Sequence, residues 1–117
     1  MAASNDPRAA LQAERVDLLA RIAALRREFG DMVTATAGSN ADDEHDPEGA
    51  TIAFERQQVA ALLGQEHEHL SQVDAALQRV DDGSYGRCLR CGRPISAERL
   101  AARPAAATCI ECAAARR

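Results

Sequence analysis

The sequence contains no lysine and no tryptophan, and only three of its 117 residues are aromatic. A chain of this length with so few aromatic side chains cannot assemble a large apolar core. β-branched residues are also scarce, whereas alanine, leucine, arginine and glutamate, which favour helices, are abundant. The composition therefore predicts a helical protein, with room for one domain or for one elongated element that carries a small appendage.

The chain also lacks the apolar segments that direct proteins to membranes. Its first residues, MAASNDPRAAL, show neither the basic nor the apolar region of a secretory signal peptide. No run approaches the roughly 20 apolar residues that a membrane-spanning helix needs. We therefore expect a cytoplasmic protein without a membrane partner. In the reducing cytoplasm, paired cysteines hold metal more often than they form disulfides.

The formal net charge of −4 is distributed unevenly along the chain. Six acids and one arginine lie between Gly38 and Arg56, whereas seven arginines and two glutamates lie between Gly83 and Arg117. A protein that is acidic overall is poorly suited to non-specific binding along DNA. The pattern instead separates an acidic middle segment from a basic C-terminal segment.

Two segments show the heptad spacing of a coiled coil, in which apolar residues alternate between steps of four and three. Each segment follows an Asp-Pro pair, at residues 6–7 and 46–47, which is typical of an N-cap followed by proline at the first helical position. The first seam consists of Leu11, Leu18, Ile22, Leu25, Phe29 and Met32, and the second of Val59, Leu63, Glu66, Leu70, Val73, Leu77 and Val80. Glu66 is a polar seam residue of the kind that fixes register.

Two helices of similar length, joined by the short polar segment GSNADDEHD, bury their seams most simply as an antiparallel hairpin. We expect an all-α fold in which residues 1–82 form a long antiparallel coiled-coil hairpin, with an acidic tip loop near 38–47. Residues 83–117 would form a small C-terminal four-cysteine zinc finger with a short C-terminal helix. Pairing of the seams between two chains is the alternative, but the loop length favours a monomer.

The only four cysteines, Cys88, Cys91, Cys109 and Cys112, follow the spacing C-x2-C-x17-C-x2-C, which is typical of a four-thiolate zinc site. A segment of about 35 residues is too short to be held by an apolar core alone, so a bound metal would stabilise it. With four protein ligands, no coordination position is left for water or substrate. We therefore expect one structural Zn²⁺ and no enzyme activity, with a redox dithiol or another metal as the alternative.

The arginines around the cysteines permit a second interpretation, in which the finger grips a nucleic acid backbone. A tetrathiolate zinc centre carries a charge of about −2, so some of these arginines could instead neutralise the site. Tyr85 is the only aromatic residue of the segment, which argues against stacking on bases. We therefore expect no sequence-specific DNA binding.

A short helix is expected between the two cysteine pairs. Ser96 has the side chain of an N-cap, and the residues after it favour a helix. This helix would carry Arg99, Leu100 and Arg103, which we expect to orient the finger against the base of the hairpin.

The segment DGSYGRCLRCGRPISAERLAARPAAATCIEC closely resembles the DksA/TraR-type zinc-finger family of bacterial regulators of RNA polymerase. The matching motifs are G-x-Y-G-x-C at 83–88, C-x-x-C-G at 88–92, R-L-x-A-R-P at 99–104 and C-I-x-C at 109–112. The resemblance implies a transcription regulator that binds RNA polymerase core directly and inserts its coiled-coil tip through the secondary channel toward the catalytic Mg²⁺. In the best-known members the response is joined to the alarmone ppGpp, which makes ppGpp a candidate partner.

The resemblance also assigns a role to the acidic tip, which carries the pattern D-x-x-D-x-A in the family. Here Asp43 and Asp46 keep the spacing of the two acids, but Glu48 stands where alanine would fall. Reading from Asp46 instead places Gly49 and Thr51 at the later positions. We expect the polymerase-facing tip to consist of Asp42, Asp43, Asp46 and Glu48.

Two other functions remain open from the residues alone. One is a zinc-containing coiled-coil adaptor for a different partner. The other is a thiol-based redox sensor, in which oxidation of the cysteines ejects the zinc.

Overall fold

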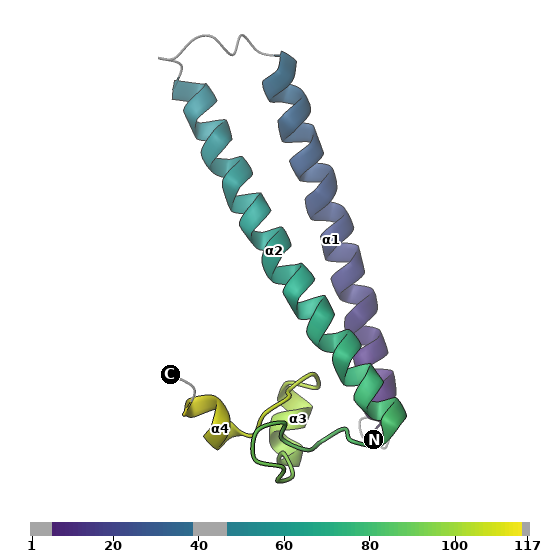
Figure 1. Cartoon of the computed structure of the whole chain (residues 1–117). Coiled ribbons are helices and arrows are strands. Elements are labelled where there is room, and N and C mark those ends of the chain that lie inside the picture. The colour runs from purple at the N-terminus through teal and green to yellow at the C-terminus, as the bar shows by residue number, and fades with distance from the viewer. Residues whose placement is uncertain (1–5, 39–46, 116–117) are drawn as a thin grey trace. The chain divides into compact units, whose positions relative to one another are not determined.

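The structure is a computed structural model that describes residues 6–38 and 47–115. These residues form four helices, α1 (Pro7–Gly38), α2 (Pro47–Asp82), α3 (Ala97–Ala102) and α4 (Ile110–Ala114) (Figure 1). Among them no strand is formed, and extended pairing is limited to one isolated bridge between Arg87 and Pro94. The prediction of an all-α fold with a long helical hairpin is confirmed.

Both long helices begin where the Asp-Pro pairs predict. The carboxylate of Asp6 accepts the backbone N–H of Arg8 at 3.1 Å, so Asp6 caps the first turn of α1. α2 begins at Pro47. A proline at the first helical position costs no hydrogen bond, because the N–H that it lacks would have no partner within the helix.

The chain divides into two compact units, which we name the finger unit and the hairpin unit. The finger unit comprises Met1–Asp17 and His69–Arg117, and the hairpin unit comprises Leu18–Glu68. Each unit therefore contains a part of α1 and a part of α2, and the finger unit also contains α3, α4 and all four cysteines. The division at residue 83 that the sequence suggests stays a prediction.

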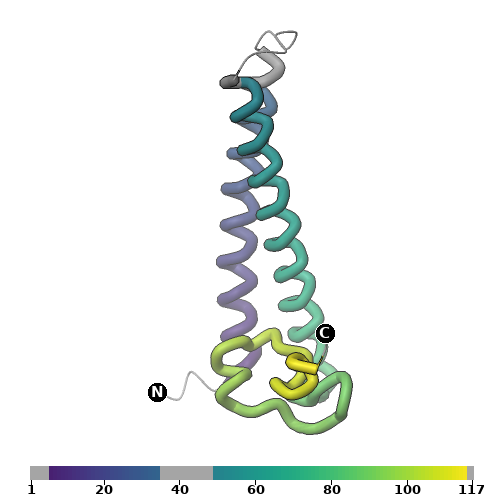
Figure 2. The backbone as a smooth tube through the Cα atoms, turned by 90° about the vertical axis from the view of Figure 1, so that its left-hand side faces the viewer, coloured from purple at the N-terminus to yellow at the C-terminus, as the bar shows by residue number. Residues whose placement is uncertain are grey.

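Ion pairs show how α1 and α2 run within the finger unit. Arg8 pairs with Asp81 at 2.6 Å, and Arg15 pairs with Asp74 at 2.7 Å. The partner's number falls along α2 as the residue number rises along α1, so the two helices are antiparallel (Figure 2). These pairs are exposed to solvent, and each contributes at most about 1 kcal/mol. They determine the register of α1 against α2 more than they add to the stability of the protein.

The predicted seams are the buried faces of both helices. Leu11 and Val73 are buried in the finger unit, and Leu18, Ile22 and Val59 in the hairpin unit. The other predicted seam residues are half-buried, namely Leu25, Phe29, Met32, Leu63, Glu66, Leu70, Leu77 and Val80. Neither helix, over the residues described, is long and apolar enough to cross a membrane.

Two seam positions show what the heptad pattern can and cannot detect. The half-buried Glu66 accepts a hydrogen bond from Arg21 Nε at 3.3 Å, which gives this polar seam residue a partner on α1. Ala76 is fully buried, although the seam does not include it. In a chain so rich in alanine, a pattern of large apolar residues cannot distinguish a buried alanine from an exposed one.

A glycine in the left-handed region ends α2 and starts the finger. Gly83 has φ of +84°, and the N–H of Ser84 donates to the carbonyl of Arg79 at 2.9 Å, as in a Schellman motif. The Asp82 carboxylate accepts the Ser84 hydroxyl at 2.6 Å and its backbone N–H at 3.0 Å. These two bonds lower the pKa of Asp82.

We expect Gly83→Ala to destabilise the protein by about 1–2 kcal/mol, because L-residues are strained at this positive φ. An added Cβ would meet no atom of the described chain within 4 Å, so the cost is conformational. Gly64→Ala is the matched control, since it also has free space but lies inside α2. It should stabilise the protein by up to about 1 kcal/mol. Urea unfolding of the zinc-loaded protein measures both, and equal effects of the same sign would contradict this account.

Candidate metal centre

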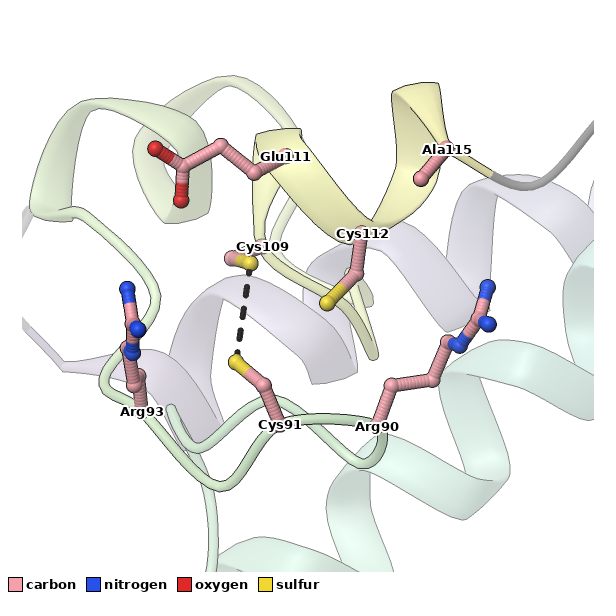
Figure 3. Close-up of a pocket in the computed structure, with 7 residues that line it drawn as sticks. All are labelled: Arg90, Cys91, Arg93, Cys109, Glu111, Cys112 and Ala115. Atoms are coloured by element: carbon pink, nitrogen blue, oxygen red, sulfur yellow. Dashed lines mark hydrogen bonds between the residues drawn. The ribbon is translucent and has the colours of Figure 1, made fainter.

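The four cysteines converge on one point of the finger unit. Their Sγ atoms all lie within 4.8 Å of one another, and those of Cys91 and Cys109 are 3.8 Å apart (Figure 3). With Zn–S bonds of about 2.3 Å, sulfur atoms at the corners of a tetrahedron lie about 3.8 Å apart. The arrangement therefore fits one Zn²⁺ bound by Cys88, Cys91, Cys109 and Cys112. The prediction of a single structural zinc is confirmed.

The first cysteine pair lies in a tight turn that two backbone hydrogen bonds hold together. The N–H of Cys88 donates to the carbonyl of Arg93 at 2.8 Å, and the N–H of Gly92 donates to the carbonyl of Cys88 at 2.9 Å. Gly92 has φ of +76°, a value that a side chain would make costly. The glycine after the second cysteine therefore lets the turn present both sulfur atoms to the same ion.

Backbone donors favour the thiolate form of Cys88. The N–H groups of Arg90 and Cys91 point at its sulfur over 3.4 and 3.5 Å. Burial raises the pKa of Cys88, but hydrogen bonds from the backbone of Cys91, Cys109 and Arg90 outweigh burial and lower it to about 6. Hydrogen bonding to the sulfurs of Cys109 and Cys88 raises the pKa of Cys112 to about 12. In this arrangement of the sulfur atoms, Cys88 is therefore the more acidic thiol and Cys112 the less acidic one.

We expect the affinity for zinc to rise with pH between about 6 and 8, because Zn²⁺ must displace protons that the metal-free thiols hold. A free cysteine thiol has a pKa of about 8.5, so the thiols of the metal-free finger hold most of their protons over this range and release them on binding. Calorimetric titration in two buffers of different ionisation enthalpy counts the protons released. Zinc binding that releases no proton at pH 7 would contradict binding through thiols that are protonated in the metal-free chain.

The second cysteine pair is built on the start of α4. Cys109 is the N-cap residue of this helix, and its carbonyl accepts the N–H of Ala113 at 2.9 Å. Cys112 lies one turn further, on the same side of the short helix. The N–H of Leu89 donates to the carbonyl of Ala107 at 2.8 Å, which joins the first turn to the segment that leads into the second pair.

The apolar core of the finger is very small. Cys88, Cys109 and Ile95 are buried, and Leu100 and Cys112 pack against them. Three of these five side chains are zinc ligands. Because so little apolar surface is available, the bound metal has to supply most of the stability of the finger.

The helix between the cysteine pairs forms as predicted. The Ser96 hydroxyl accepts the N–H of Arg99 at 3.1 Å and caps α3. Arg99 Nε donates to the carbonyl of Thr108 at 2.8 Å, Leu100 packs on the finger core, and Arg103 is exposed at the C-cap. These contacts lie inside the finger. The role of Arg99, Leu100 and Arg103 at the hairpin base stays a prediction.

We expect Arg99→Met to destabilise the zinc-loaded finger by about 1.5–3 kcal/mol, which is the usual contribution to stability of a hydrogen bond that involves a charged group. Methionine keeps much of the aliphatic stem but leaves the Thr108 carbonyl, next to a zinc ligand, without its donor. Arg103→Met removes the same charge from an exposed position and should change stability by less than about 0.5 kcal/mol. Thermal unfolding of both variants at saturating zinc makes the comparison, and equal losses would show that the bond is unimportant.

Tyr85 has a structural role that sequence reasoning missed. Its hydroxyl donates to the carbonyl of Pro104 at 2.8 Å, and its N–H donates to the carbonyl of Arg79 at 3.1 Å. Burial raises the pKa of Tyr85. The tyrosine therefore joins the end of α2 to the R-P segment of the finger, and it is not available to stack on a base.

The predicted tip falls mostly outside the described residues. This is true of Asp42, Asp43 and Asp46, while the backbone of Glu48 lies in the first turn of α2. The assignment of these four acids to a polymerase-facing tip stays a prediction.

Comparison with known proteins found one match to the finger alone and one to nearly the whole chain. Residues 83–117 match the model of the prokaryotic dksA/traR C4-type zinc finger. Over 98% of its length the chain resembles the structure of transcription factor DksA2 from Pseudomonas aeruginosa, with a TM-score of 0.78 and 31% sequence identity. That match covers 83% of the DksA2 chain.

Two curated relatives share shorter segments. The RNA polymerase-binding transcription factor DksA of Caulobacter vibrioides is 52% identical over 42 residues, which are 36% of this chain and 30% of the relative. The uncharacterized protein YteA of Bacillus subtilis is 39% identical over 72 residues, which are 62% of this chain and 30% of YteA. The chain thus covers less than a third of the length of either relative.

Proposed function

The chain belongs to the DksA/TraR zinc-finger family, and from this membership we propose that it is a transcription regulator that binds RNA polymerase core directly. One observation carries the proposal: the likeness to DksA2 extends over 98% of the chain and so includes the hairpin as well as the finger. The Caulobacter relative is itself named as an RNA polymerase-binding factor. The family resemblance seen in the sequence is confirmed.

The finer part of the proposal concerns the tip between the two long helices. α1 and α2 have 32 and 36 residues, which at about 1.5 Å per residue gives each a length of about 50 Å. Such helices can carry the acids Asp42, Asp43, Asp46 and Glu48 through the secondary channel of the polymerase. Near the catalytic Mg²⁺, carboxylates can perturb the metal's coordination or pair with basic residues.

The regulator would act by binding and not as an enzyme. All four positions of a tetrahedral zinc are taken by the cysteines, so the metal has no site at which to activate water or substrate. ppGpp is an additional ligand to test on the complex. Because the chain has no lysine, contacts of this protein with its phosphates would have to come from arginine.

A photocrosslinking residue at position 46, in the presence of cognate core RNA polymerase, tests the proposal. Peptide mapping by mass spectrometry should find crosslinks to residues around the catalytic Mg²⁺. The matched control places the same residue at Val16, which lies on α1 in the finger unit and is 65% exposed. It should give no crosslink near the Mg²⁺.

Other results of the crosslinking experiment would distinguish polymerase binding through the tip from the alternative functions. Binding to core with crosslinks elsewhere would overturn the role of the tip and leave polymerase binding in place. No binding to core would favour the adaptor or the redox sensor. Release of zinc by mild peroxide, in step with a change in activity, would then identify the sensor.

A further inference from the structure

A cavity of about 480 Å³ lies beside the sulfur atoms of the metal centre. Cys91, Cys109 and Cys112 line it, together with Arg90 and Arg93 from the first cysteine turn, and with Glu111 and Ala115. Figure 3 shows the two arginine side chains on opposite sides of the Cys91–Cys109 pair, both extending from the turn that carries Cys91. Two guanidinium groups therefore share one space with three of the four zinc ligands.

Among the described residues, the two cavity arginines have no acidic partner, unlike Arg8, Arg15 and Arg21 of the long helices. Arg8, Arg15 and Arg21 each pair with a carboxylate across the hairpin. Neither Arg90 nor Arg93 forms an ion pair with any acid of residues 6–38 or 47–115. Neither positive charge is therefore paired directly with a carboxylate of these residues.

The zinc centre supplies the missing negative charge. Four thiolates around one Zn²⁺ leave a net charge of about −2, on large sulfur atoms that face the cavity. We propose that Arg90 and Arg93 are the counter-charges of the zinc–tetrathiolate centre and that they raise the affinity of the four cysteines for zinc. Glu111 contributes one opposing charge to the same cavity, so the compensation is partial.

Backbone hydrogen bonds keep both arginines beside the metal ligands. The carbonyl of Arg93 accepts the N–H of Cys88 at 2.8 Å, and the N–H of Arg90 points at the Cys88 sulfur over 3.4 Å. The ligand turn and its two counter-charges are therefore one local structure. A guanidinium group suits this role because it presents five N–H donors in a rigid, planar arrangement.

The dissociation constant for zinc of the full chain tests the proposal, measured by competition with an uncharged chelator. An uncharged chelator is needed because arginine would attract an anionic one. We expect Arg90→Gln/Arg93→Gln to weaken zinc binding about tenfold, the lower end of the effect of outer-shell partners. The difference should shrink in 1 M salt, where the screening length is about 3 Å. The matched control, Arg26→Gln/Arg103→Gln, removes two charges from exposed positions outside the cavity and should leave the constant unchanged.

Two further variants separate charge from structure. Arg90→Lys/Arg93→Lys keeps both charges and should restore most of the affinity. Glu111→Gln removes the opposing charge and should tighten binding by about threefold. The proposal is overturned if Arg90→Gln/Arg93→Gln binds zinc with normal affinity, or if Glu111→Gln weakens zinc binding. It is also overturned if the loss of affinity persists in high salt and occurs in Arg90→Lys/Arg93→Lys as well.

Discussion

Cys112→Ser is expected to abolish stable zinc binding and to unfold the finger, while α1 and α2 stay folded. One thiolate of four is lost, and the remaining apolar core of Cys88, Ile95, Cys109 and Leu100 is too small to hold a segment of this length. Structural zinc contributes about 10–16 kcal/mol to the folding of zinc-finger peptides at pH 7. No interaction between the other side chains of the finger approaches this magnitude.

The measurement has to distinguish loss of the finger from loss of the hairpin. α3 and α4 have only 6 and 5 residues against 32 and 36 for the long helices, so far-ultraviolet circular dichroism should change little. Tyr85 is the only tyrosine of a chain without tryptophan, and its hydroxyl is bonded inside the finger unit. Its near-ultraviolet signal therefore reports on the finger and should collapse together with the zinc content.

The matched control for this experiment is Ile110→Ser, at an exposed position between the last two cysteines. It adds the same hydroxyl to the same turn without removing a ligand, and it should keep one zinc per chain. Full zinc content and an unchanged tyrosine signal in Cys112→Ser would show that three thiolates suffice. The centre would then not be a closed four-cysteine site.

The elements that sequence reasoning predicted best are those set by local chemistry. The start of α1 at Asp6-Pro7, the end of α2 before Gly83 and the Ser96 cap each depend on backbone groups a few residues away. The seams follow from periodicity alone. The cysteine spacing identified the zinc ligands because two C-x-x-C turns can each present two sulfur atoms to one ion.

What the sequence could not show depends on contacts between distant segments. Ala76 is buried, and Ile95 is buried in the cluster with Cys88 and Cys109, yet neither belongs to a repeating pattern of large apolar residues. The bond from Tyr85 to Pro104 joins residues 19 apart. Composition revealed an excess of arginine near the cysteines, but only the cavity separates Arg90 and Arg93 from the other arginines of the finger.

Asp43→Asn/Asp46→Asn is expected to remove the effect of the protein on transcription while zinc content and helicity stay normal. The substitution deletes two negative charges and keeps the size and shape of the side chains. Asparagine is as good an N-cap as aspartate, so the start of α2 at Pro47 should be preserved. If the carboxylates act on Mg²⁺ or on basic residues of the polymerase, losing them costs about 2–5 kcal/mol, equivalent to about 30-fold or more in the effect.

The lifetime of promoter complexes with cognate RNA polymerase, measured over a range of protein concentration, is the appropriate readout. A matched control, Asp17→Asn/Asp31→Asn, removes two exposed acids from α1 and should keep the full effect. If both variants lose activity alike, the result reflects net charge and not the tip. If the tip variant keeps full activity, Asp43 and Asp46 are not needed for regulation, and the regulatory contact has to be sought outside these two acids.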